Sequence, residues 1–160
     1  MSTEQIVPEQ LLAQIGSGPI SVGRPALRVA LTGDEQAQAL PIVVRRPTLR
    51  DAQRARGVLR AGTKDPANFI VALEVEAAIA PHPASARAAA GTVDGVGIPS
   101  ETDTIRYVGT PSGLVSLIRD IYAAEVADAV LITPIDGSAT ATRVREEVLP
   151  ALADRVARVA

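Results

Sequence analysis

The sequence predicts an α/β protein in which short buried strands alternate with helices. Apolar runs such as Ala26–Leu31 and Ala127–Thr133 are too short for helices and are bounded by glycine or proline. Between such runs lie stretches in which apolar residues recur at helical spacing behind capping residues. Strands that alternate with helices in this way form a parallel sheet with right-handed crossovers. We expect about four strands.

The first 25 residues are predicted to be a lead-in to one domain that spans residues 26–160. They contain a short helical segment, Pro8–Ile15, and a passage rich in glycine and proline that favours turns. Ala26–Leu31 and Leu40–Val44 then have the composition of strands buried on both faces. The stretch between these two strands is too short for an ordinary crossover helix.

A helix is predicted from Thr48 to Gly62. Thr48 can cap it with Asp51 at the third position, and an apolar stripe follows on one side (Leu49, Ala52, Val58 and Leu59). A turn at Lys64-Asp65-Pro66 separates this helix from a third strand, Phe69–Ala80, which is rich in Val, Ile and Ala.

The region from Pro81 to Asp103 is predicted to hold a short helix, Ala84–Ala90, followed by a loop from Gly91 to Ser100. The glycines of this loop lack the GxGxxG order and do not follow a strand directly. They therefore do not indicate a dinucleotide site.

The last third carries the clearest pattern. Thr110 can cap a helix with Pro111 in its first turn, and Leu114, Ile118, Ile121 and Tyr122 share one face. A buried strand, Ala127–Thr133, follows. Ser138 can open a final helix with an apolar stripe (Val144, Val148, Leu152, Val156 and Val159), which Pro150 should kink or divide.

Composition excludes several function classes. The chain has no cysteine, which excludes disulfides and thiolate zinc sites. A net charge of −2 and only three aromatic residues argue against a nucleic-acid partner. The start of the chain lacks the basic and apolar pattern of a secretory leader, and no apolar run approaches the roughly 20 residues that span a bilayer. We therefore expect a cytoplasmic protein that is not embedded in a membrane.

Three segments of the last third resemble the C-terminal end of the luciferase-like flavin-dependent monooxygenases. Tyr107–Val115 is similar to the family's "VGTP" segment, which opens a helix. Ala127–Pro134 resembles its "GaDGFvL" strand, and Glu147–Leu152 resembles its closing "vPeLq" segment.

The resemblance extends upstream in the same order. Gly23-Arg24-Pro25 and the strand after it are similar to the family's "GRPVLVQAG" segment. Pro47–Ala52 resembles the helix that follows the next strand, and Lys64-Asp65-Pro66 resembles the "GRDP" turn. Residues from about Gly18 to the end are covered.

This resemblance implies half of a (β/α)₈ barrel, because only the fifth to eighth strands are matched and a complete barrel takes about 250 residues. It also implies reduced flavin mononucleotide (FMN), or a deazaflavin relative, as cofactor, no metal, and a small organic substrate. The family's phosphate-binding serine after the fifth strand is replaced here by Thr32-Gly33-Asp34-Glu35. Thr32 and Gly33 are the nearest cofactor-binding candidates, and the two carboxylates beside them would repel a phosphate.

Three further patterns contain residue types that can carry chemistry. His82, the only histidine, follows a strand and could act as a lone acid or base, but an exposed turn is the simpler interpretation. Glu74 and Glu76 share one face of a strand, where they could share a proton or hold a metal, or simply be solvated. No residue is assigned a catalytic role.

An arginine cluster is the densest charge feature (Arg45, Arg46, Arg50, Arg54, Arg56 and Arg60). Arg46, Arg50 and Arg54 have the four-residue spacing of one helical face, which could bind an anionic metabolite or an acidic protein. A solvated face is the simpler interpretation. Binding through this face would be sensitive to salt and would be lost on combining Arg46→Ala with Arg50→Ala.

Two functions therefore remain open. The first is a truncated or degenerate flavin-dependent monooxygenase or oxidoreductase, whose isolated chain need not be active. The alternative is a non-catalytic binding or assembly module that pairs with itself or with a flavoenzyme subunit. Because a half-barrel exposes strand edges, either function predicts a homo-oligomer or a complementary barrel-half chain.

Overall fold

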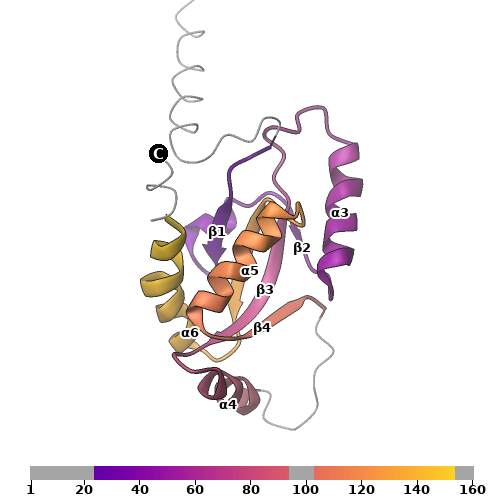
Figure 1. Cartoon of the computed structure of the whole chain (residues 1–160). Coiled ribbons are helices and arrows are strands. Elements are labelled where there is room, and N and C mark those ends of the chain that lie inside the picture. The colour runs from indigo at the N-terminus through magenta and orange to yellow at the C-terminus, as the bar shows by residue number, and fades with distance from the viewer. Residues whose placement is uncertain (1–23, 94–102, 154–160) are drawn as a thin grey trace, which may run out of the picture.

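The computed structural model describes residues 24–93 and 103–153, in which helices and strands alternate along the chain (Figure 1). The predicted helix Pro8–Ile15 and most of the predicted loop Gly91–Ser100 lie outside the described residues. The strands are β1 (Arg28–Leu31), β2 (Val43–Val44), β3 (Ala72–Ile79), β4 (Ile105–Gly109) and β5 (Ala129–Pro134). The helices are α2 (Glu35–Gln38), α3 (Leu49–Ala61), α4 (Pro83–Val93), α5 (Pro111–Ala123) and α6 (Ser138–Arg143), which continues into the π-helical turn η2 (Val144–Val148).

The strands form one parallel sheet, so the predicted α/β class is confirmed. Their order is β1-β5-β3-β2, and β4 pairs with β3 beyond the end of β2. The described residues contain five strands where about four were expected, because no strand was predicted at Ile105–Gly109. Read from the other edge, the order β2-β3-β5-β1 follows the chain with β4 left out, and it places the first strand beside the last, as in a closed barrel. The sheet is open between β1 and β2.

One face of the sheet, the first face, is covered by α3, α5, α6 and η2 (Figure 1). Side chains from these helices interlock with alternate residues of the strands and form the main core. Its largest fully buried members include Leu31, Leu73, Ile79, Leu114, Ile118, Ile121 and Ile132. Because each fully buried aliphatic side chain contributes roughly 1.5–3 kcal/mol, this face supplies most of the hydrophobic stabilisation.

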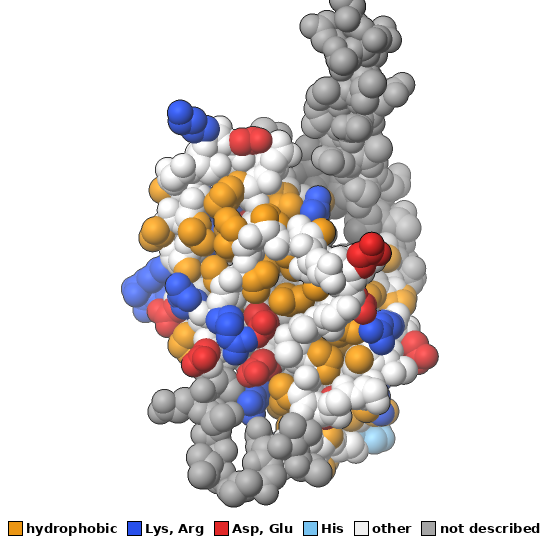
Figure 2. Space-filling view, turned by 180° about the vertical axis from the view of Figure 1, so that it is seen from behind, with side chains coloured by type: hydrophobic (Ala, Val, Ile, Leu, Met, Phe, Trp, Pro, Cys, Tyr) orange, Lys and Arg blue, Asp and Glu red, His pale blue; other side chains and the backbone are white. Residues whose placement is uncertain are grey.

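The opposite, second face of the sheet carries a smaller core beneath the connection from β1 to β2. The connection contains only the four-residue α2, which buries none of its own residues, so the near-deletion of this crossover helix is confirmed. Leu40, which follows α2, packs against second-face residues of three strands (Ala30, Ile70, Ala72, Ala129 and Leu131). Figure 2 shows this side of the molecule, with apolar side chains at the surface and charged side chains around them.

Helices α3 and α5 begin where their capping residues predict. The Thr48 side chain accepts a hydrogen bond from the Asp51 N–H, and Thr110 accepts one from the Gly113 N–H. The apolar face predicted for α5 is buried, whereas that of α3 was partly wrong. Val58 is 76% exposed and Arg56 is buried in its place.

The final helix accommodates Pro150 by widening rather than by ending. The Leu149 N–H bonds to the carbonyl of Val144, five residues earlier, which is the π-helical spacing. In an α-helix, the ring of a proline clashes with the backbone carbonyl four residues earlier. The wider π-helical turn before Pro150 relieves this clash. Val144 and Val148 remain fully buried, as the predicted stripe requires.

Candidate functional site

Four polar side chains lie in one row across the second face of the sheet, at the level where β1 and β5 end. Thr32 follows β1, Thr133 lies in β5, Glu76 in β3 and Arg106 in β4. The strand register places Thr133 beside Glu76 and Glu76 beside Arg106. The Thr32 and Thr133 hydroxyls are hydrogen-bonded at 2.6 Å. We call these four residues the polar row.

The predicted cofactor residue Thr32 lies at the open end of this row. Its hydroxyl donates to the Ile132 carbonyl at 3.1 Å, and its side chain is exposed. Gly33 next to it has φ of +94°, a conformation that favours glycine, and no atom lies within 4 Å of the position of an added Cβ. Both residues are thus accessible from solvent. Their role in cofactor binding stays a prediction.

The carboxylates that follow Gly33 differ in environment. Asp34 accepts a hydrogen bond at 2.8 Å from Arg145 of η2, whereas Glu35 is exposed at the start of α2. The Arg145 guanidinium offsets the charge of Asp34. The repulsion that the sequence predicts toward a phosphate at Thr32 is therefore weaker than two unpaired carboxylates would produce.

Glu74 and Glu76 lie on the same face of β3, as their spacing predicts, and each is half-buried beside an arginine. Glu74 forms an ion pair with Arg45, and Glu76 Oε1 lies 3.7 Å from Arg106 Nη2. Ion pairing with arginine is an arrangement that the sequence interpretation did not include. Arg106 was missed because its strand was missed, although Ile105 and Tyr107 alternate with it in the manner of a half-buried strand.

The polar row offers hydrogen-bond donors to an anion or a carbonyl. The Arg106 guanidinium can donate, each hydroxyl can donate once it rotates away from its present acceptor, and the Gly33 backbone is open to close approach. Within residues 24–93 and 103–153, no cluster of three metal-ligating side chains is present. His82 is exposed in the turn after β3. The row therefore suits binding of a polar ligand.

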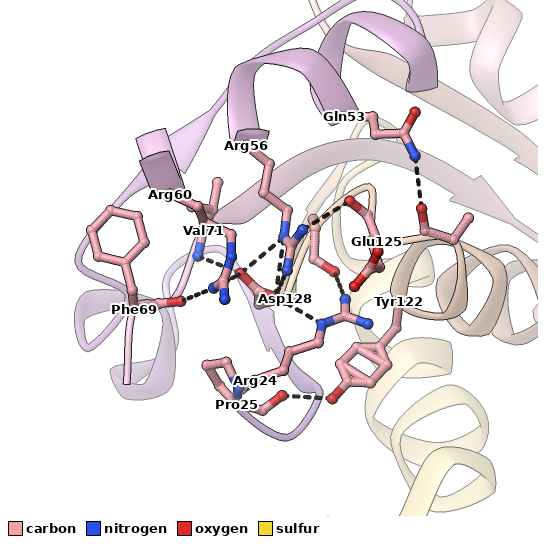
Figure 3. A network of polar contacts seen from close by, with 12 residues as sticks. Arg24, Pro25, Gln53, Arg56, Arg60, Phe69, Val71, Tyr122, Glu125 and Asp128 are labelled. Atoms are coloured by element: carbon pink, nitrogen blue, oxygen red, sulfur yellow. Dashed lines mark hydrogen bonds and ion pairs between the residues drawn. The ribbon is translucent and has the colours of Figure 1, made fainter. Parts of the chain in front are cut away.

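A second polar cluster lies at the amino ends of the strands and surrounds Asp128, which is fully buried (Figure 3). Arg56 Nη2 lies 2.9 Å from Asp128 Oδ1, Arg24 Nε lies 3.1 Å from the same oxygen, and Arg60 Nη1 lies 3.9 Å from Oδ2. The Val71 N–H donates to Oδ2 at 3.1 Å. We call Arg24, Arg56, Arg60 and Asp128 the Asp128 cluster.

Burial by itself would raise the pKa of Asp128, because it disfavours the charged carboxylate. The hydrogen bonds from Arg56, Val71 and Arg24 together outweigh burial, so its pKa is lowered from 3.8. Asp128 is thus ionised at neutral pH and fixes two arginines that the sequence interpretation assigned to a solvated face. Since the amino ends of parallel strands carry stability rather than chemistry in α/β barrels, this cluster is structural.

Arg24 and Pro25, which the sequence assigns to the lead-in, contact the last third of the chain. The Arg24 guanidinium lies 3.8 Å from the centroid of the Tyr122 ring, and the Tyr122 hydroxyl donates to the Pro25 carbonyl (Figure 3). These contacts, with Asp128, anchor the chain just before β1. The division of the chain at residue 25 stays a prediction.

Three of the remaining arginines, Arg45, Arg46 and Arg54, border a groove of about 800 Å³ between β2 and α3. Arg46 precedes α3, which begins at Leu49, so Arg46, Arg50 and Arg54 do not share one helical face as predicted. The groove is lined by apolar residues (Ile42, Val43, Val44, Ala55, Val58 and Leu59) and by Arg45, Arg46, Asp51 and Arg54. It lies along an open edge of the sheet.

In the part of the chain that the structure describes, no helix is long and apolar enough to cross a lipid bilayer.

Comparison with known proteins supports the fold. No protein-family profile matches the sequence. No curated protein matches it either. Among solved structures, the chain is similar to a riboflavin lyase, RcaE, whose structure contains modified FMN and the substrate riboflavin, at 15% sequence identity and a TM-score of 0.52. The match covers 82% of this chain and 43% of the lyase chain. This chain therefore has a parallel α/β fold like a part of a flavin enzyme, consistent with a partial barrel.

Proposed function

We propose that this chain is a flavin-binding half-barrel of a flavin-dependent oxidoreductase, and that the polar row contacts the flavin. The single observation that carries the proposal is the alignment of Arg106 with Thr32 and Thr133 in one row across the second face, with the two threonines near the carboxyl ends of β1 and β5. Ligands of α/β sheets bind at this end of the strands. The fold shared with part of a flavin enzyme supports the same ligand class.

The donors of the row fit the oxygens of FMN. Thr32 and the Gly33 backbone would hold the phosphate, which the resemblance to the luciferase-like family also implies. Arg106, already beside Glu76, would donate to a ring carbonyl or to a substrate. FMN, or a deazaflavin relative, supplies hydride and electron transfer when bound and would oxidise a small organic substrate, as a monooxygenase does.

Turnover requires more than this chain's described residues provide. Within them the row contains no nucleophile held by a base, and β1 and β2 leave the sheet open. We infer that the catalytic site is completed when a second barrel half joins, either another copy or a complementary chain.

Fluorescence titration of FMN with the purified protein tests the proposal, with riboflavin as the ligand that lacks the phosphate. Thr32→Val keeps the side-chain shape and removes the hydroxyl. Since a hydrogen bond to a charged group contributes about 1.5–3 kcal/mol, we expect FMN binding to weaken by roughly tenfold or more and riboflavin binding to change little. Ser112→Ala, which removes an exposed hydroxyl from the first turn of α5, is the matched control.

The alternative function is a non-catalytic assembly module, which the arginine-bordered groove favours. The same titration separates the two functions. A protein that leaves flavin fluorescence unchanged at high protein concentration, whether monomeric or associated, would contradict flavin binding and leave the assembly module.

A further inference from the structure

The two edges of the sheet differ in charge. On one side lie β2 and α3, and on the other lie β1, α6 and η2 (Figure 1). The first side, the arginine edge, carries Arg46, Arg50 and Arg54, all exposed. The second side, the glutamate edge, carries Glu146 and Glu147 of η2, also exposed. It also carries Arg145, which is paired with Asp34, and exposed Arg28 at the start of β1. Figure 2 shows a cluster of basic side chains at one edge, with acidic side chains beside it, and side chains of both charges at the opposite edge.

The charges of both edges are unpaired among residues 24–93 and 103–153. Arg50 and Arg54 form no hydrogen bond or ion pair there, and Arg46 donates only to the carbonyl of Arg45. Glu146 and Glu147 likewise have no such contact within the described residues. Each edge therefore presents charge that a partner of opposite sign can neutralise.

The arginine edge also exposes apolar surface. Val58 is 76% exposed and Val43 is 39% exposed, and both line the groove of about 800 Å³ between β2 and α3. Beyond β2 no described strand pairs with the sheet, so backbone groups of this strand face outward. Open strand edges and exposed apolar side chains are features that proteins ordinarily cover.

The strand order indicates what covers them. In a barrel each strand lies beside the next strand of the chain. β1 lies at one edge of this sheet and β2 at the other. Apart from β4, which pairs with β3 beyond the end of β2, a second copy placed with its β2 beside β1 of the first would continue the order as β2-β3-β5-β1-β2-β3-β5-β1.

We propose that two copies of this chain associate head to tail, with the arginine edge of one against the glutamate edge of the other. Joining like edges instead would bring Arg46 and Arg54 against themselves, which repulsion disfavours. The head-to-tail contact pairs both charge sets, covers Val43 and Val58, and joins two open strand edges. It rests on the proposed half-barrel and names the second half as another copy.

Charge reversal tests this contact directly, with mass measured by light scattering after size exclusion. Arg46→Glu with Arg54→Glu makes both edges acidic, and Glu146→Arg with Glu147→Arg makes both edges basic. We expect the wild type to associate at low salt, and each double variant to be monomeric with at least tenfold weaker self-association. An equimolar mixture of the two variants should associate again, because every contact in it pairs opposite charges.

The matched control is Lys64→Glu with Arg87→Glu, which changes the net charge as Arg46→Glu with Arg54→Glu does but at exposed positions on neither edge. This control should associate like the wild type. Circular dichroism of every variant checks folding, which these exposed substitutions should preserve.

A wild-type protein that stays monomeric at every concentration and salt level would overturn the proposal, as would association that survives both reversals or a mixture that stays monomeric. Since mass is read without flavin, failure of this contact is distinguishable from failure of flavin binding. If the wild-type protein binds flavin but stays monomeric, only the head-to-tail contact is contradicted. If it associates but does not bind flavin, only flavin binding is contradicted.

Discussion

Arg56 Nη2 lies 2.9 Å from Asp128 Oδ1, and the two side chains come from α3 and from the residue just before β5. Removal of one partner from a buried ion pair leaves an uncompensated charge. We therefore expect Arg56→Ala to lower the free energy of unfolding by about 3 kcal/mol or more. Arg54→Ala, two residues earlier and exposed, should change it by no more than about 0.5 kcal/mol. Urea denaturation of both variants measures the difference, and equal effects would contradict the structural role of Asp128.

The lowered pKa of Asp128 predicts acid sensitivity. A carboxyl group whose pKa is lower in the folded than in the unfolded protein stabilises the fold above its unfolded pKa, near 3.8. That stabilisation is lost as the pH falls from about 4 through the folded pKa. Urea denaturation between pH 2 and pH 7 should show this loss. In Asp128→Asn, which has no carboxylate to protonate, the loss should be smaller, and an unchanged pH profile would contradict the assignment.

Gly113 should not tolerate a side chain while Tyr107 keeps its hydroxyl. A Cβ at Gly113 would overlap the Tyr107 hydroxyl, which donates to the Thr110 carbonyl at 2.9 Å. We expect Gly113→Ala to destabilise the protein by about 1–3 kcal/mol, as overpacking does. In a Tyr107→Phe background, where the overlapping atom is absent, the same substitution should be much less destabilising. Thermal denaturation of the four proteins gives the coupling, and additive effects would count against this contact.

Tyr122 should contribute to the stability of the fold through both its ring and its hydroxyl. Tyr122→Phe removes the hydrogen bond to the Pro25 carbonyl and should cost about 1 kcal/mol of stability. Tyr122→Leu also removes the ring beneath Arg24 and should cost roughly a further 0.5–1 kcal/mol. Chemical denaturation measures both steps. If the two variants are equally stable, the ring contact contributes nothing.

Local features of the fold were predictable because the responsible residues are close in sequence. Thr48 and Thr110 cap their helices through bonds to residues three positions later. The buried stripe of α5 follows from apolar spacing alone. The alternating pattern of Ile105–Gly109 was also present, but no strand was predicted there.

The pairing of distant residues was not predictable from one sequence. Arg56 and Arg54 are two positions apart in a run of similar residues, and only the position of Asp128 decides that one is buried and the other exposed. Likewise, Thr32 was proposed for its place after a strand. Its neighbours Thr133 and Arg106 depend on the strand order, in which β5 lies between β1 and β3.

The pairing of the first strand with the last also constrains the order of folding. Among the residues that the structure describes, Arg28 to Leu31 pair only with Ala129 to Ile132, so β1 has no partner there until about a hundred further residues are present. At a synthesis rate of about 5–20 residues per second, β1 waits on the order of 5–20 s on the ribosome before it can dock. The remaining sheet must then form around β3, and the N-terminal strand is the last to be added.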